Sequence, residues 1–311
     1  MKNRYVIIIF SALVLLGMTI TGCPNATEQL PYIDFNRPAD EAVSQKDESV
    51  QRPIFIALAS VMSPHETIIY YRKIADYVSK ETGRPAVLVQ RKTYAEVNLL
   101  LANGDVDIAF LSTGAYSSYQ GMNEIEPLVM TEHDNSVLYT ADVIVHKDSN
   151  IHSISDLQGK VFAFTDPLSY SGHMVIEDYL RDHNTLPERF FQRYFYTYSH
   201  DKSLWAVANH IADGASFDSQ IYEYVKVRNP ELAGNVRIIT SMEPAPTGPV
   251  VISQRVPPEQ KEELRRIFLS MHQDPETAAA MQKLVIDRFV PPAPDLYDPL
   301  RKLYKRTGAR P

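Results

Sequence analysis

The sequence predicts an α/β protein of two lobes, each built on a largely parallel sheet. Short apolar runs alternate with segments whose apolar residues recur at helical spacing, which is typical of βαβ units. This alternation stops and restarts once, around VLYTADVIVHK at 137–147. About 260 residues follow the polar N-terminal part, which is too many for one small core and sufficient for two.

The first series lies between residues 53 and 111. It contains, in chain order, a buried strand at 53–60, a helix that ends at Gly83, a strand at 86–90, a helix that ends at Gly104 and a strand at 107–111. Ser63 and Glu66 have the spacing of a capping box, and Pro64 suits a first helical position.

The second series begins after the run at 137–147. Its predicted elements are strand 161–165, helix 172–183, strand 191–196, helix 200–212, a short strand at 215–217, helix 219–228 and strand 236–240. PVVIS at 249–253, two helices at 257–272 and 275–289 and a proline-rich tail follow. Chain crossings near 137–147 and 243–253 therefore place lobe 1 at 53–142 and 248–311, and lobe 2 at 143–247.

The first 23 residues have the features of a signal peptide. Lys2 and Arg4 precede an uncharged, mostly apolar run of 16 residues, which is shorter than the ~20 residues of a membrane-spanning helix. The run ends in Ile20-Thr21-Gly22-Cys23, which resembles the bacterial lipoprotein box, where the cysteine is acylated and becomes the mature N-terminus. We expect lipidation at Cys23 in preference to a free thiol, and a flexible tether at 24–52 that holds the folded part off a membrane.

Composition narrows the classes of partner. The net charge is −7, with 38 acidic and 31 basic residues, and the chain has no cluster of Lys and Arg, so we expect no nucleic-acid partner. Cys23 is the only cysteine, which excludes an internal disulfide and a cysteine-based metal cage. The nine histidines have no clear metal-ligand spacing, so we predict neither a metal nor a cofactor.

Two strand-to-helix corners are rich in hydroxyl groups. In DVDIAFLSTGAY the strand leads into Ser112 and Thr113, and in VFAFTDPLSYSG the next strand leads into Ser169, Tyr170 and Ser171. Helix N-termini present unpaired N–H groups and the positive end of the helix dipole, which together suit an anion. In open α/β sheets such corners line the ligand crevice. The alternative is that these hydroxyls only cap helices, although a cap needs one hydroxyl and each corner has two or three.

Three further polar residues lie at similar corners. His200 and Asp218 each follow a strand and begin a helix, and Tyr94 lies in a strand-to-helix turn. Each has an ordinary structural explanation, as a helix start for His200 and Asp218 and as a core ring for Tyr94. His65 and His173 also lie where they could face a cleft, although a surface position suits them better.

Several of these segments, in order and spacing, resemble one known family. The stretches TYAEV, GDVDIAFLSTGAY, DPLSYSGH, SHDKSLWAVANHIADGASFDS and PAPTGPVVIS look like the phosphonate, phosphite and phosphate binding proteins of ABC transporters over roughly residues 53–290. The resemblance implies a type II periplasmic-binding-protein fold, in which two α/β lobes close on a phosphorus oxyanion in the cleft between them. It also implies a monomer that serves an ABC permease, without a cofactor.

The family's ligand positions map onto residues of this sequence. They fall on Tyr94, Ser112, Thr113, Ser169, Tyr170, Ser171, His200 and Asp218. Family members similar to the aminoethylphosphonate binder also carry a glutamate just after the position of Asp218 and an aspartate in the second crossing. Here Gln220 and the uncharged 246–249 stand there, so a small phosphonate, phosphite or phosphate suits the site better than an amino-bearing ligand.

Three other functions stay open at this point. Ser, His and Asp side chains could form an enzyme site, but the chain lacks a G-x-S-x-G elbow, an HExxH motif and a Walker loop, so we expect no catalysis. A lipoprotein that reports its ligand to a membrane receptor would have the same sequence features. An organic solute is the third alternative, because aromatic residues lie near the expected cleft, namely Tyr94, Tyr116, Tyr119 and Tyr170.

Overall fold

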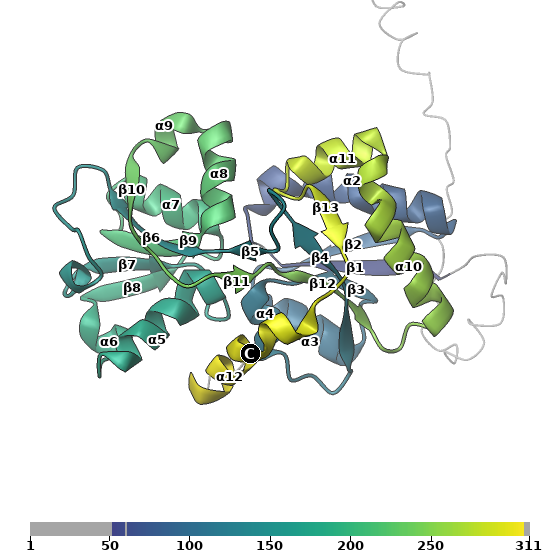
Figure 1. Ribbon diagram of the computed structural model, residues 1–311, viewed down its shortest axis with the longest axis horizontal. Coiled ribbons are helices and arrows are strands. Elements are labelled where there is room, and N and C mark those ends of the chain that lie inside the picture. Colours follow the sequence, from purple (N-terminus) through teal and green to yellow (C-terminus); the bar gives the residue numbers. More distant parts are fainter. Residues whose placement is uncertain (1–51, 60, 308–311) are drawn as a thin grey trace, which may run out of the picture. The chain divides into compact units, whose positions relative to one another are not determined.

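The computed structural model describes residues 52–59 and 61–307, so the signal peptide, Cys23 and nearly all of the predicted tether lie outside the described residues. One sheet has six strands in the order β13-β4-β12-β3-β1-β2 (Figure 1). Its strands are β1 (Ile54–Leu58), β2 (Ala86–Gln90), β3 (Ile108–Phe110), β4 (Ile125–Glu132), β12 (Pro249–Ser253) and β13 (Arg288–Val290). We call this sheet and the elements packed on it the first lobe.

The second lobe is built on a five-stranded sheet in the order β10-β6-β9-β7-β8. Its strands are β6 (Ala141–His146), β7 (Val161–Phe164), β8 (Arg193–Tyr196), β9 (Gly214–Asp218) and β10 (Val236–Ser241). The two crossings pair with each other through β5 (Leu138–Tyr139) and β11 (Ala245–Pro246). Lobe boundaries at 142/143 and 247/248 stay a prediction, but the paired crossing strands lie close to both.

Both sheets mix parallel and antiparallel strands. β1 runs parallel to β2 and β3, and β7 runs parallel to β8 and β9, as the alternation predicts. The prediction of a largely parallel sheet is wrong for the rest, since β12 is antiparallel to β3 and β4, and β6 is antiparallel to β9 and β10. β6 and β12 come directly after the two crossings. In each sheet this strand pairs with the outer member of the three parallel strands, β12 with β3 and β6 with β9.

Helices cover both sheets (Figure 1). They are α2 (Pro64–Thr82), α3 (Tyr94–Asn103), α4 (Thr113–Ser118), α5 (Val175–Asp182), α6 (Pro187–Phe190), α7 (His200–Ala208), α8 (Ser219–Arg228), α9 (Pro230–Ala233), α10 (Pro258–Ser270), α11 (Pro275–Gln282) and α12 (Asp298–Thr307), with short turns η2 (Ser155–Leu157), η3 (Tyr170–Met174), η4 (Met271–Gln273) and η5 (Pro294–Tyr297). α10 and α11 pack on α2, so the chain returns to the first lobe as predicted. Within the described ranges, no helix is both long enough and apolar enough to cross a membrane.

Two local predictions are wrong, and one element was not predicted. The Ser63 side chain makes no capping bond at α2, and its hydroxyl lies 3.3 Å from that of Ser199, whereas a capping box forms at Thr93 and Glu96. The helix predicted at 275–289 ends at Gln282, because the chain turns there and continues into β13. The third difference is an omission: no element was predicted in the proline-rich tail, which contains α12, a helix whose first residues tolerate proline.

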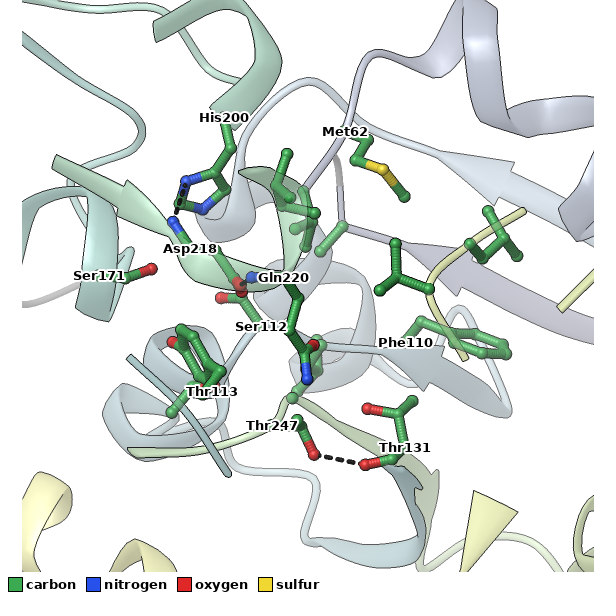
Figure 2. Close-up of a pocket in the computed structure, with 18 of the residues that line it drawn as sticks. Met62, Phe110, Ser112, Thr113, Thr131, Ser171, His200, Asp218, Gln220 and Thr247 are labelled. Carbon is green, nitrogen blue, oxygen red and sulfur yellow. Dashed lines mark hydrogen bonds between the residues drawn. The ribbon is translucent and has the colours of Figure 1, made fainter. Parts of the chain in front are cut away.

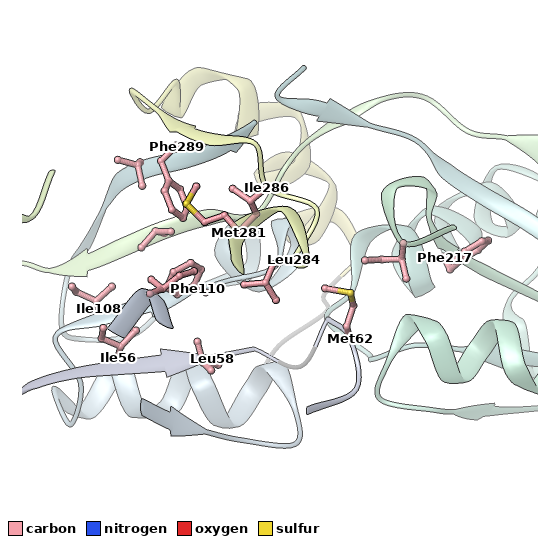
Figure 3. Close-up of a cluster of buried hydrophobic side chains, with 14 of the residues drawn as sticks. Ile56, Leu58, Met62, Ile108, Phe110, Phe217, Met281, Leu284, Ile286 and Phe289 are labelled. Atoms are coloured by element: carbon pink, nitrogen blue, oxygen red, sulfur yellow. The ribbon is translucent and has the colours of Figure 1, made fainter. Parts of the chain in front are cut away.

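The inner strands β3, β6, β7 and β12 are buried on both faces, which explains their nearly continuous apolar runs. Ile56 and Leu58 enter one hydrophobic cluster, while Ala57 between them enters a second. The first cluster gathers Phe110, Met281, Leu284, Ile286 and Phe289 above the β1–β3 part of the sheet (Figure 3). These packed sheets hold the strand ends, and therefore the corners that follow them, in place.

Candidate binding site

One cavity collects most of the residues singled out in the sequence (Figure 2). Its polar lining consists of Tyr71, Ser112, Thr113, Thr131, Tyr139, Ser169, Tyr170, Ser171, His200, Asp218, Gln220 and Thr247. These residues come from both lobes and from the crossings between them. The cavity measures ≈ 90 Å³, several times the roughly 10–15 Å³ that one water needs, so it has room for a small ligand.

The corner of the first lobe follows β3. Ser112 is the N-cap of α4, and its Oγ accepts a hydrogen bond from the N–H of Ala115 at 3.1 Å. A hydroxyl that accepts in this way still has its own proton to donate. The hydroxyl of Thr113 donates to the carbonyl of Pro246 at 2.7 Å instead. Because α4 has only six residues, its dipole is small. This corner therefore attracts an anion mainly through its hydroxyl and N–H groups.

The corner of the second lobe follows β7. Ser169 is the N-cap of η3, a π-helical turn, and its Oγ accepts from the N–H of Gly172 at 3.0 Å. π-helical turns are rare and often lie at functional sites. A Cβ atom at Gly172 would overlap the side chain of Thr165, so only glycine permits this close packing. Ser171 does not cap the turn. It is buried and lines the cavity.

His200 has a defined orientation and charge. Its Nδ1 accepts from the N–H of Asp218 at 3.1 Å, and the Thr165 hydroxyl lies 3.3 Å from the same atom. This network assigns the proton of the neutral ring to Nε2. Burial lowers the pKa of His200 to about 3, so the ring is neutral at physiological pH. His200 thus supplies one N–H donor at the cavity.

Asp218 has two roles at the start of α8. Its carboxylate accepts from the N–H of Gln220 at 2.8 Å and so caps the helix. Burial raises the pKa of Asp218 to about 7, and the nearby charge of Asp142 adds to the rise. The backbone bonds from Gln220 and Ile221 oppose this shift. A carboxyl with this pKa near neutral pH can donate or accept, according to its protonation.

The tyrosines divide into cavity residues and core residues. Tyr170 lines the cavity, and burial raises its pKa to about 12. Tyr94 is outside the described lining, although its buried hydroxyl has no hydrogen-bond partner among the described residues. Burial raises the pKa of Tyr94, and the nearby carboxyl groups of Asp166 and Asp218 raise it further. A ligand role for Tyr94 stays a prediction.

The other aromatic and histidine candidates lie elsewhere. The Tyr116 hydroxyl accepts from Arg301, and that of Tyr119 donates to the Asn123 carbonyl. His65 is exposed, and the Nδ1 of His173 lies 2.9 Å from the Pro167 carbonyl, outside the described lining. The aromatic residues that do line the cavity are Tyr71, Phe110, Tyr139 and Tyr170, of which only Tyr170 was among the sequence candidates.

Sequence reasoning missed Tyr139 and Thr131. Tyr139 lies on β5 in the first crossing and lines the cavity. Burial raises the pKa of Tyr139, while hydrogen bonding with Thr113 and Ser171 opposes the rise, so its hydroxyl connects the two corners. Its place in a crossing segment was the available signal, since both crossings pass between the lobes.

Direct hydrogen bonds join the lobes around the cavity. The N–H of His200 donates to the Val61 carbonyl at 3.0 Å, and the N–H of Tyr94 donates to the Asp166 carboxylate at 3.2 Å. On α12, the Tyr304 hydroxyl donates to the Leu168 carbonyl at 2.9 Å. The lobes are thus in direct contact beside the cavity.

A second polar group lies apart from the cavity. His133 Nδ1 is 3.3 Å from the carboxylate of Asp287, and the N–H of Asp134 donates to the same carboxylate at 2.7 Å. These contacts hold the turn after β4 against the segment that leads into β13. Asp134 and Asp287 are exposed, so a structural role accounts for the group.

The chain was compared with known proteins. Residues 56–297 match a family model described as "ABC transporter, phosphonate, periplasmic substrate-binding protein". The chain is 27% identical over 186 residues to the phosphonates-binding periplasmic protein of Escherichia coli (strain K12), covering 58% of this chain and 54% of that protein. It is 26% identical over 195 residues to the phosphate-import protein PhnD of Mycolicibacterium smegmatis, covering 59% and 60%. The matches thus span little more than half the length of these curated relatives.

A solved structure extends the similarity to the fold. The binding protein component of an ABC phosphonate transporter from Pseudomonas aeruginosa superposes with a TM-score of 0.76 at 25% identity, covering 83% of this chain and 87% of that one. The two sheets and the crossings between them form a type II periplasmic-binding-protein fold. The chain therefore belongs to the family of periplasmic substrate-binding proteins of ABC phosphonate transporters.

Proposed function

We propose that the chain is an extracytoplasmic solute-binding lipoprotein that captures a small phosphorus oxyanion and delivers it to an ABC permease. The observation that carries this proposal is the single cavity in which hydroxyls of both lobes meet the neutral ring of His200. No Lys or Arg is among the described residues of its wall, so the anion would be held by dipolar donors. The names of the relatives, which bind phosphonates or import phosphate, support the same ligand class.

The magnitudes are sufficient for binding. A phosphoryl group that accepts five or six charge-assisted bonds gains roughly 1.5–3 kcal/mol from each. The sum exceeds the roughly 8 kcal/mol of a micromolar complex, and the excess offsets dehydration and lost freedom. Because the ligand contacts both lobes only when they are closed, its binding favours the closed state.

Asp218 gives the site a way to distinguish oxyanions. When it is ionised, its carboxylate accepts a hydrogen bond from a ligand that carries a P–OH group, such as a monohydrogen phosphate or phosphonate. Sulfate has no proton at neutral pH and would leave two negative charges unpaired against each other. We infer that Asp218 selects against sulfate.

The proposal is tested by thermal unfolding with phosphate, phosphite, methylphosphonate, 2-aminoethylphosphonate and sulfate. A true ligand at a hundredfold excess over its Kd should stabilise the protein by about 2.7 kcal/mol. The proposal fails if no phosphorus compound raises the Tm. Turnover of phosphate esters or phosphonates during incubation would indicate an enzyme instead.

Membrane attachment and delivery are tested separately. We propose that an acylated Cys23 anchors the protein, and that the folded part acts as a monomer. In cells, Cys23→Ser should release the protein from the membrane fraction, while the purified protein keeps its ligand affinity. If Cys23→Ser stays in the membrane fraction, the anchor is contradicted but the binding site is not.

A further inference from the structure

The cavity has a second, apolar side that a phosphate ion would not use. Its members line the same cavity as the polar group but carry no hydrogen-bonding side chain: Met62, Phe110, Ile221, Leu284, Val285 and Ile286. In Figure 2, Met62 and Phe110 lie on one side of Gln220, while His200 and Ser171 lie on the other. A ligand that fills both sides would have a charged oxygen head and an apolar end.

The apolar side is a built feature of the fold. Met62 comes from the segment before α2, and Leu284 to Ile286 come from the turn between α11 and β13. Figure 3 shows Met62 next to Leu284, with Ile286 beyond it. In this turn the N–H groups of Leu284 and Ile286 both donate to the Met281 carbonyl, at 2.8 and 3.0 Å. Val285 between them has φ +59°, a left-handed conformation that is an outlier for a β-branched residue and more usual for glycine at a helix end. Such strain is often found at binding sites.

No counter-charge accompanies the apolar side. Asp218 is the one acidic residue in the described cavity wall, and its carboxylate already accepts from the Gln220 N–H at the start of α8. An ammonium group placed against Met62 and Phe110 would lose water without gaining a carboxylate to pair with. A hydrocarbon group of the same length would gain from the same burial.

From this arrangement we propose that the ligand is a phosphonate whose carbon substituent is a short, uncharged alkyl chain, such as ethyl or propyl. The phosphonate oxygens bind the hydroxyls and His200, and the alkyl group of the ligand packs among Met62, Leu284 and Ile286. This inference rests on the proposed function, since it assigns the second half of the same site. The small cavity of ≈ 90 Å³ limits the length of the alkyl group that the ligand can carry.

Calorimetric titration of the purified protein tests this with phosphate and with methyl-, ethyl-, propyl- and 2-aminoethylphosphonate. Propyl- and 2-aminoethylphosphonate have nearly the same shape and differ in the charge at the end. Affinity should rise about fourfold per added methylene, which corresponds to about 0.8 kcal/mol. Propylphosphonate should bind at least tenfold more tightly than 2-aminoethylphosphonate.

The possible outcomes separate the two proposals. If 2-aminoethylphosphonate binds as tightly as propylphosphonate, or if affinity falls with each methylene, the alkyl assignment is wrong while the oxyanion site remains. If neither phosphate nor any phosphonate binds, the proposed function itself is wrong.

A matched pair of variants tests where the alkyl group of the ligand lies in the cavity. Met62 is 6% exposed and Met122 is 98% exposed, so Met62→Gln adds a polar group to the apolar side and Met122→Gln adds one to the surface. Met62→Gln should remove the rise in affinity from methylphosphonate to propylphosphonate, and Met122→Gln should retain it. An unchanged gain in Met62→Gln overturns the placement. If Met62→Gln does not fold, Ile286→Val removes one methylene from the same wall and should lower the gain.

Discussion

The two lobes present hydroxyl groups to the same cavity by different means. In the first lobe an α-helical corner uses Ser112 as its cap and holds Thr113 against a crossing carbonyl. In the second lobe a π-helical turn uses Ser169 as its cap and leaves Ser171 uncommitted to the helix. Capping and ligand binding are therefore compatible, because a serine that accepts an N–H bond keeps its own proton. A third kind of hydroxyl, on Ser171, has no capping role.

The largest expected effect comes from the place where the two corners approach each other. A Cβ atom at Gly114 in α4 would overlap the carbonyl oxygen of Leu168 in the second lobe. Gly114→Ala should therefore hold the lobes apart and weaken ligand binding at least a hundredfold, about 2.7 kcal/mol. Calorimetry measures the loss, and small-angle scattering measures the separation of the lobes.

A second glycine serves as the control for this prediction. Gly234 has an ordinary helical φ of −68° and no close neighbour in the other lobe, so Gly234→Ala should bind ligand like the wild type. Unchanged affinity in Gly114→Ala would show that closure does not need this approach.

The serines of the two corners give the next largest effect. Ser112→Ala and Ser171→Ala should each weaken binding roughly 10- to 100-fold, because each loses one charge-assisted bond of about 1.5–3 kcal/mol. Only Ser112→Ala should also lower the stability of the ligand-free protein, by about 1 kcal/mol, because it removes a helix cap. Ligand-free urea unfolding compares the two. Equal losses of stability would mean that the corners do not differ as described.

His200 makes the second lobe sensitive to acid. Its folded-state pKa of about 3 lies below the ordinary value of 6.5, so the unfolded chain binds the proton first. The stability that the neutral ring contributes is complete above pH 6.5 and is lost as the pH falls toward 3. Between pH 6.5 and pH 5 the loss should be roughly 1.5 kcal/mol. Urea unfolding at both pH values should show this loss in the wild type and a smaller one in His200→Asn.

Asp218 should produce the smallest effect on stability, and its pH dependence should have the opposite sign to that of His200. Its folded-state pKa of about 7 lies above the ordinary 3.8, so the folded protein holds the proton and becomes less stable as the pH rises. The wild type should lose roughly 1 kcal/mol between pH 6 and pH 8 relative to Asp218→Asn. Asn keeps the capping oxygen, which isolates the charge. Thermal unfolding of both proteins at the two pH values measures this.

The same variant tests discrimination between ligands. Asp218→Asn should narrow the difference in affinity between sulfate and the phosphorus ligand, because it removes the charge that rejects sulfate. If calorimetry shows the same difference in both proteins, Asp218 serves only as a cap.

Local patterns predicted most of the elements and several of the site residues. The helix at 219–228 and the strand at 86–90 have the predicted bounds, because period and turn residues act locally. The tail helix α12 and the early end of α11 were missed, because tertiary packing decides both. At Val285 the chain takes a left-handed turn that no local pattern would predict for a β-branched residue.

The sequence by itself determined the alternating elements, the hydroxyl corners after β3 and β7, and the absence of clustered positive charge. Only the tertiary structure decided which of these groups meet. It brought Ser112, Ser171, His200 and Asp218 to one cavity and kept the Tyr94 ring in the core. It also brought Met62 to the same cavity wall as Leu284 and Ile286, more than two hundred residues away along the chain. Residue period and turn chemistry are local properties, whereas a binding site depends on contacts between segments that are distant in sequence.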